Sequence, residues 1–281
     1  MLPLLLGSIA GLALGLVGGG GSILTVPLLV GVLGMPPREA TTMSLVVVGM
    51  AALWGTIPHA RRGNVLWSRA LLFGAVGMVG ALAGGAVNAT VAPRTLLGGF
   101  VIVMVVAAVA MLRRAGALSL TATMPSLVYV AGGSATPAGA GSRLADRIRA
   151  RAGGSCPLID HGPFVATALG VGFMTGFFGV GGGFLIVPAL VLVLRLPMPL
   201  AVGTSLPIIA LNSATGFLSH LGNGATLDLP LTALFTAGAI VAALVGGAVS
   251  TRLPAAALAR AFALVVLALA AFLAIQVIHT P

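Results

Sequence analysis

Charge is scarce in this chain, and the little that is present comes mostly from arginine. Only 6% of its 281 residues are charged, whereas a soluble domain typically carries about 25%. Lysine is absent, and the acids are limited to Glu39, Asp146, Asp160 and Asp228. Since 59% of the residues are hydrophobic and long apolar runs recur, this composition excludes a soluble globular domain and predicts an integral membrane protein.

Further absences exclude several kinds of chemistry. Without lysine the chain has no Walker phosphate-binding loop, so we expect no ATP-driven transport by this chain alone. The sequence has one cysteine, Cys156, and four scattered histidines, which do not have the spacing of metal ligands. It also shows no nucleophile paired with a base, so nothing in it indicates an enzyme. We therefore expect neither a metal nor a cofactor. The net charge of +10 comes from arginines in loops, without aromatic–basic alternation, so nucleic acid is not an expected partner.

Eight apolar runs divide the chain into two halves. The runs fall at about 2–33, 40–57, 69–91, 95–112, 162–195, 200–219, 229–250 and 255–278. The gap between the fourth and fifth runs is rich in Arg, Gly and Ser, and its part from 142 to 152 fits either a short amphipathic helix or a solvated loop. We therefore predict an N-terminal membrane repeat at 1–112, a basic cytoplasmic linker at 113–161 and a C-terminal membrane repeat at 162–281.

The second half repeats the first at an offset of 161 residues. Aligning 11–93 with 172–254 without a gap gives 25 identical pairs in 83 positions, and these include Ser44/Ser205, His59/His220 and Pro93/Pro254. Shared Ser, His and Pro positions over such a length are not expected from apolar composition alone. The sequence therefore predicts an internal duplication.

Each repeat opens with a glycine-rich segment that ends in proline. Residues 11–27 read GLALGLVGGGGSILTVP, and residues 172–188 read GFMTGFFGVGGGFLIVP. As one straight helix the run 2–33 would be about 48 Å long, but the hydrocarbon core of a bilayer is only about 30 Å thick. We therefore expect half-helices at 2–17 and 22–33 that meet at the glycines, with corresponding half-helices at 162–178 and 184–195.

The arginines distinguish two topologies for these broken segments. If all eight runs cross the membrane, nine arginines lie on one side and five on the other. If each broken run returns as a hairpin, the split becomes twelve to two, with only Arg38 and Arg94 outside. The positive-inside rule favours the hairpins. The predicted fold is an all-α polytopic membrane protein with two homologous four-segment repeats, inverted relative to each other, each opening with a re-entrant hairpin.

The glycine runs are the predicted binding site. Glycines allow backbone N–H groups to approach a ligand closely, and a helix N-terminus favours an anion. Neutral hydroxyl and amide groups nearby suit a desolvated oxyanion, although hydrogen bonding between helices would also explain them. For Thr41 we leave both interpretations open, anion binding and hydrogen bonding between helices. The candidate substrate-binding residues are Gly18, Gly19, Gly20, Gly21, Ser22, Thr42, Ser44, Gly179, Gly181, Gly182, Gly183, Thr204, Ser205 and Asn212.

Two further groups of residues have alternative interpretations. The repeat-paired His59 and His220 could couple transport to protons, or could simply lie at the membrane interface. Glycines in the third and seventh runs predict close helix packing rather than a site; they are Gly74, Gly77, Gly80, Gly84, Gly85, Gly238, Gly246 and Gly247.

At its glycine segments the chain resembles the sulfite exporter TauE/SafE family of membrane permeases. The resemblance rests on GLVGGGG at 15–21 followed by Pro27, on GFFGVGGG at 176–183, and on AVGTS at 201–205, and it covers nearly the whole chain outside the linker. It implies transport of a small sulfur-containing anion (sulfite, thiosulfate or an organosulfonate) across the cytoplasmic membrane. The two copies differ at Gly19/Val180 and Ser22/Gly183, so unequal contributions to the ligand stay open.

The leading hypothesis is therefore a multi-pass secondary transporter that moves this anion by alternating access. An anion channel and a non-transporting membrane assembly subunit are the alternatives. The expected partners are the small anion and the lipid bilayer, and homo-oligomerisation, direction of transport and coupling ion are left open.

Overall fold

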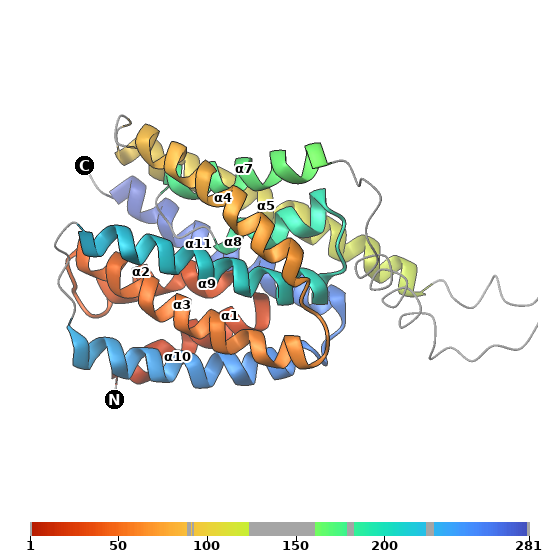
Figure 1. Cartoon of the computed structure of the whole chain (residues 1–281), viewed down its shortest axis with the longest axis horizontal. Coiled ribbons are helices and arrows are strands. Elements are labelled where there is room, and N and C mark those ends of the chain that lie inside the picture. The colour runs from red at the N-terminus through yellow and green to blue at the C-terminus, as the bar shows by residue number, and fades with distance from the viewer. Residues whose placement is uncertain are drawn as a thin grey trace, which may run out of the picture.

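The computed structural model of the chain describes residues 2–88, 91, 93–123, 161–178, 183–222 and 228–279. Within these ranges all regular structure is helical (Figure 1), as predicted. The elements are α1 (Leu2–Val17), α2 (Gly20–Gly31), α3 (Pro37–Arg61), α4 (Trp67–Asn88), α5 (Pro93–Thr123), α7 (His161–Phe178), α8 (Gly183–Pro188), the π-helix η2 (Ala189–Val193), α9 (Met198–Gly222), α10 (Leu229–Ser250) and α11 (Ala255–His279). Of the predicted linker at 113–161, residues 124–160, which include the candidate short helix, lie outside the described residues.

Six of the described helices are long and apolar enough to cross a membrane. They are α3, α4, α5, α9, α10 and α11. The remaining apolar helices, at Leu2–Val17, Gly162–Phe178 and Gly183–Val193, are shorter. The chain is thus a polytopic helical membrane protein in which the first run of each half is broken.

Gly18 ends the first half-helix. Its φ of 83° lies in the left-handed region, and its N–H donates to the Leu14 carbonyl at 2.7 Å. A residue with a side chain is strained in that conformation, so glycine directly after a helix is a common terminator. Helix α1 therefore ends at Val17 as predicted, whereas α2 begins at Gly20, two residues earlier than expected.

After this break the chain reverses direction. A Cβ added to Gly21 would clash with the Ala10 carbonyl oxygen and with Leu14 of α1. In a straight helix Ala10 and Gly21 would be about 16 Å apart, so α2 must fold back along α1. In the second half α8 packs against α7 and continues as η2 directly after Pro188.

Several backbone and hydroxyl hydrogen bonds recur at the 161-residue offset. Each pair ends the second half-helix or begins the following long helix in the same way. The pairs are Leu33 N–H to Leu28 O with Leu194 N–H to Ala189 O, Met35 N–H to Leu29 O with Leu196 N–H to Leu190 O, Ala40 N–H to Pro36 O with Ala201 N–H to Pro197 O, and Ser44 Oγ to Thr41 O with Ser205 Oγ to Val202 O.

The turn after each half-helix also has the same unusual backbone. Gly34 has φ 68°, and its equivalent Arg195 has φ 52°; Arg195 is the one described non-glycine residue with positive φ.

We predict that Arg195→Gly raises the Tm of the purified protein by roughly 2 °C. The left-handed conformation costs a side-chain-bearing residue about 1–2 kcal/mol, which exceeds the roughly 0.5–1 kcal/mol of added chain entropy from glycine. Gly34→Ala, where an added Cβ meets nothing, is the matched reverse change and should lower the Tm. An unchanged or lower Tm for Arg195→Gly would contradict the prediction.

Small residues allow two helix pairs to pack with their backbones in contact. A Cβ on Gly7, Gly11 or Gly15 of α1 would clash with successive carbonyls of α10, those of Phe235, Ala239 and Ala243. Likewise, Gly172 and Gly176 of α7 lie against Gly77 and Ala81 of α4. In both pairs the numbers rise together, so α1 runs parallel to α10 and α7 runs parallel to α4.

The packing role predicted for glycines in α4 and α10 is largely confirmed. Gly80 and Gly84 abut the backbone of α7, Gly238 and Gly246 abut that of α1, and Gly247 lies against Gly55; Gly74 and Gly77 are also in contact with neighbouring helices. The prediction is wrong for Gly85, because a Cβ there would meet nothing within 4 Å. Gly85 lies on an exposed face of α4, which sequence spacing alone did not distinguish.

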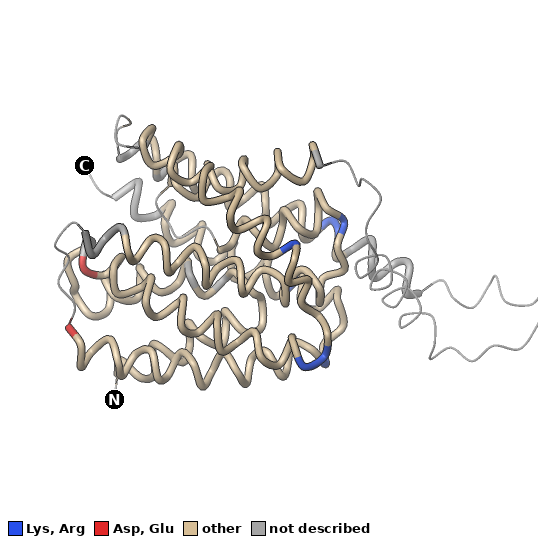
Figure 2. Tube along the Cα trace, viewed as in Figure 1, with Lys and Arg blue, Asp and Glu red and all other residues tan. Residues whose placement is uncertain are grey.

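The contacts of α3 with α9 and with α10 define the directions of the central helices. Along α3 and α9, Leu45 lies near Gly216, Gly49 near Ser213, and Asn64 beyond the end of α3 near Gly203, so these helices are antiparallel. By contrast, α3 runs parallel to α10, because Gly55 lies near Ala243 and Arg62 bonds the Thr251 carbonyl. The acids Glu39 and Asp228 stand at the starts of α3 and α10, and Figure 2 shows the acidic residues at one end of the bundle and arginine toward the other.

Candidate functional site

The break between α1 and α2 lies against the start of α8. Gly19, the residue before α2, lies so close to Gly183, the first residue of α8, that an added Cβ would clash with the Gly183 carbonyl. On the other side of the break, a Cβ on Gly18 would be 2.6 Å from Ser205 Oγ and 3.3 Å from Val202 Cα. Gly18, Gly19, Gly183 and Ser205 are all buried. Residues from the two halves of the chain therefore come together at this candidate site.

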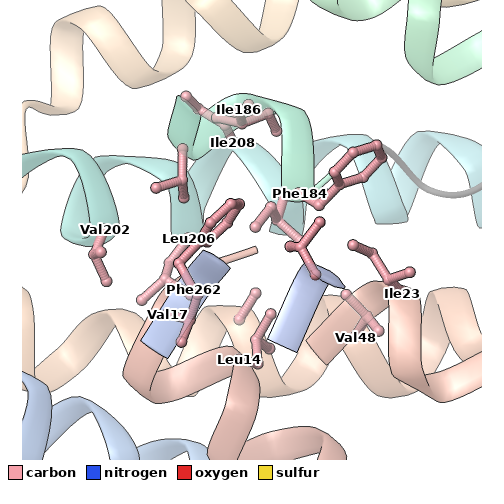
Figure 3. Close-up of a cluster of buried hydrophobic side chains, with 14 of the residues drawn as sticks. Leu14, Val17, Ile23, Val48, Phe184, Ile186, Val202, Leu206, Ile208 and Phe262 are labelled. Atoms are coloured by element: carbon pink, nitrogen blue, oxygen red, sulfur yellow. The ribbon is translucent and has the colours of Figure 1, made fainter. Parts of the chain in front are cut away.

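Apolar side chains surround this meeting point. Figure 3 shows residues from six helices around the break: Leu14 and Val17 (α1), Ile23 (α2), Val48 (α3), Phe184 and Ile186 (α8), Val202, Leu206 and Ile208 (α9), and Phe262 (α11). Most of them are no more than 2% exposed. The site is thus closed off from solvent in this conformation, and its low-polarity surroundings strengthen any electrostatic interaction made there.

The hydroxyl groups predicted for the site have different roles. Ser205 faces Gly18 and donates to the Val202 carbonyl at 2.8 Å, so an acceptor would have to compete with that bond. Ser44 makes the equivalent bond to Thr41. Thr204 instead accepts a hydrogen bond at 3.2 Å from the backbone N–H of Leu66, which ties α9 to the loop before α4. Thr42 is fully buried.

The structure does not bring the whole predicted set together. Asn212 lies seven residues beyond Ser205 on α9, about 10 Å along the helix axis, between contacts of Leu211 with Gly74 and of Ser213 with Gly49. Its Oδ1 is buried, and no described residue forms a hydrogen bond with it. Gly179, Gly181 and Gly182 lie outside the described residues. Gly20 and Ser22 are described only through their backbone in α2.

Three residues near the breaks have roles that the sequence pattern did not indicate. Thr25 is fully buried and donates to the Gly21 carbonyl at 2.8 Å, within the first turns of α2. Val187 forms a wall of the site, with Cγ2 3.1 Å from the Gly18 Cβ position. Ser250 of α10 is a hydrogen-bond partner of His59. The repeat equivalent of Ser250 is position 89, which is alanine. A search for polar residues that occur in both repeats therefore does not find Ser250.

The electrostatic character of the site comes from the backbone. The N-cap Gly19 provides no side-chain hydrogen bond for α2. The first N–H groups of a helix have no partner within it, and the macrodipole places about half a positive charge there. Since Gly19 abuts the backbone of Gly183, the first turns of α2 and of the helical segment 183–193 lie against each other. Helix N-termini favour the binding of an anion, so the arrangement suits one.

Comparison with known proteins gives a consistent result. The model of the sulfite exporter TauE/SafE family matches residues 3–273. A "probable membrane transporter protein" of Xylella fastidiosa is 34% identical and covers 95% of this chain and 91% of its own length. The "probable membrane transporter protein YunE" of Bacillus subtilis is 29% identical over 78% of this chain and 77% of its own. No solved structure matches the chain.

Proposed function

We propose, from the premise that this chain belongs to the sulfite exporter TauE/SafE family, that it is a secondary transporter of a small sulfur-containing oxyanion. Family membership and the names of its relatives support membrane transport in general. Sulfite, thiosulfate and organosulfonates are the substrates proposed here. They share a compact tetrahedral or pyramidal oxyanion that backbone N–H groups can surround.

The contact between Gly19 and Gly183 carries this proposal. Two positive helix ends that meet in an apolar core repel one another, and an anion between them removes that repulsion. Each helix terminus contributes roughly 0.3–1 kcal/mol at an exposed site, and up to about 2 kcal/mol when partly buried. Ser205 can add a hydroxyl donor by rotating away from Val202. These groups replace the hydration of the anion without adding a fixed charge to the membrane interior.

The directions of the helices support an inverted repeat. If each half crossed the membrane four times, α3 and α9 would cross in the same direction. With a re-entrant hairpin, each half crosses three times, so α3 and α9 cross in opposite directions, in agreement with their antiparallel contact. The hydrogen bonds repeated at the 161-residue offset support the duplication. Rocking of two such halves about the paired breaks would open the buried site to each side in turn.

Flux through proteoliposomes tests the function. Purified protein should exchange radiolabelled thiosulfate, sulfite or sulfoacetate across the vesicle wall, with saturation and counterflow that a channel does not show. Liposomes without protein provide the background. If none of the three anions is exchanged and none drives counterflow of another, the proposal is wrong. Continuous, non-saturating current in planar bilayers would instead indicate a channel, and no movement of any anion would favour the assembly-subunit alternative.

The proposed topology predicts which residues are reachable from outside the cell. The end of the bundle that carries Arg62 and Arg252 is assigned to the cytoplasm together with the linker, and the end that carries Asp228 to the exterior. After replacement of Cys156 by serine, a membrane-impermeant maleimide should label Asp228→Cys in intact cells. It should label Leu253→Cys, in the loop after α10, only after permeabilisation. The reverse labelling pattern would contradict the assignment.

A further inference from the structure

His59 is buried inside the bundle and is incompletely hydrogen-bonded. Its exposed fraction is 0%, although it lies near the end of α3. Its Nε2 lies 3.2 Å from Ser250 Oγ on α10. Its Nδ1 has no hydrogen-bond partner among the described residues. A polar atom buried without a partner is uncommon in native proteins and calls for a reason.

The ring lies beside the helix break without entering it. A Cβ on Gly203 of α9 would be 3.1 Å from His59 Cβ, and one on Gly247 of α10 would be 3.6 Å from His59 Cδ2. The same turn of α9 presents Val202 and Ser205 to Gly18. The histidine and the candidate anion site thus contact neighbouring faces of one helical turn, and a movement of that turn reaches both.

The end of α1 also faces the ring. The backbone of Gly15, in the last turn of α1, interacts with His59, although Nδ1 does not form a hydrogen bond of usual geometry with it. The last carbonyls of a helix lack partners within it and form the negative end of the macrodipole. A protonated imidazole could therefore donate from Nε2 to Ser250 and from Nδ1 toward the Gly15 carbonyl.

No carboxylate stands near His59 in the described part of the chain. The faces that α1, α9 and α10 turn toward it present Gly15, Gly203, Gly247 and Ser250, and the nearest charge on α3 is the cation Arg62. Glu39 is twenty residues away at the other end of α3, about 30 Å along the axis. A buried cation without a counter-charge is costly. An anion at the adjoining break would supply the missing negative charge.

We propose that His59 is the proton-binding site of the transporter, and that one proton binds to it with each anion that binds at the Gly18–Gly19 break. The inference rests on the proposed function and identifies its coupling ion. The proton is taken up and released with the anion, and no bond of the substrate changes. By linkage, each ligand strengthens the binding of the other. Because position 89 is alanine where position 250 is serine, the role is assigned to His59 and not to its repeat partner His220.

Calorimetry counts the linked protons directly. Thiosulfate is the probe, because it stays fully ionised through the pH range in which histidine titrates. Titration of the wild-type protein in two buffers of different ionisation enthalpy should report net proton uptake approaching one per anion. The affinity should rise as the pH falls, by up to about tenfold per pH unit, which is the limit for a single linked proton. Proton uptake of zero would overturn the inference while leaving the transport function intact.

Variants locate the proton. His59→Gln should lose both proton uptake and the pH dependence of thiosulfate affinity, whereas the matched change His220→Gln should keep both. If His59→Gln does not fold, Ser250→Ala provides the second measurement, because it removes the Nε2 partner and should move the affinity profile to lower pH. Retained proton uptake in His59→Gln, or an unmoved profile in Ser250→Ala, overturns the proposal. If the wild-type protein neither binds nor exchanges thiosulfate or the other two anions, the proposed function fails, and the inference fails with it.

Discussion

Replacing Gly19 with alanine is expected to abolish anion exchange while leaving the protein folded. Gly19 has φ −111°, a backbone conformation that alanine adopts freely, so the effect is steric and not conformational. The added methyl would lie within the space of the Gly183 carbonyl and 2.8 Å from Phe184 Cα. Backbone atoms cannot turn aside as a flexible side chain can, so α2 and α8 must separate. The paired N–H groups then no longer converge on one anion.

The measurement is the initial rate of thiosulfate counterflow in proteoliposomes, normalised to the amount of inserted protein. We expect a decrease of at least tenfold, which corresponds to about 1.4 kcal/mol of lost stabilisation for the bound anion. Gly31→Ala is the matched control, because Gly31 belongs to the same half-helix and an added Cβ there meets nothing within 4 Å. If Gly19→Ala has the counterflow rate of the wild type, Gly19 does not belong to the binding site.

Replacing Gly11 with leucine is expected to prevent stable folding. An added Cβ at Gly11 would fall on the carbonyl oxygen of Ala239 and 2.6 Å from its Cα, in the middle of the α1–α10 contact. Overpacking a well-filled core typically costs about 1–3 kcal/mol. Here the obstacle is backbone, and the neighbouring contacts at Gly7 and Gly15 would be lost together with it. We therefore expect a cost at or above the upper end of that range.

The loss should be visible as aggregated protein in detergent size-exclusion chromatography and as a strongly reduced yield of inserted protein. Gly170→Leu is the control, since Gly170 lies on α7, the counterpart of α1 in the second half, with no atom within 4 Å of an added Cβ. A monodisperse Gly11→Leu protein with an unchanged Tm would mean that α1 is not held against α10 in this way.

Much of the local structure was predictable because its causes are local. Gly18 ends α1 where the glycine run begins, and this followed from glycine's unique access to the left-handed region. The half-helices were placed within two residues of their observed starts at Gly20 and Gly183. The exposed Gly85 shows the limit of this reasoning, since spacing alone does not tell a packed face of a helix from a lipid-facing one.

Part of the candidate site was also predictable, since the repeat singled out Ser205 and the glycines on both sides of it. Ser250 and the burial of His59 were not. The serine at position 250 is not duplicated, and His59 stands two residues before the end of α3, where an interfacial position was also reasonable. Its burial results from contacts with α1, α9 and α10, which are distant in sequence.

The sequence by itself determined that this protein lies in a membrane, and it predicted an internal duplication whose first copy begins with a helix that ends before Gly18. Composition, sequence repetition and backbone freedom depend only on the residues themselves and on their order along the chain. Only the tertiary structure decided that Gly19 meets Gly183, that α3 and α9 run in opposite directions, and that His59 lies against the end of α1. Those facts depend on how closely small residues let helices approach each other, and that is settled by packing between segments that are distant in the sequence.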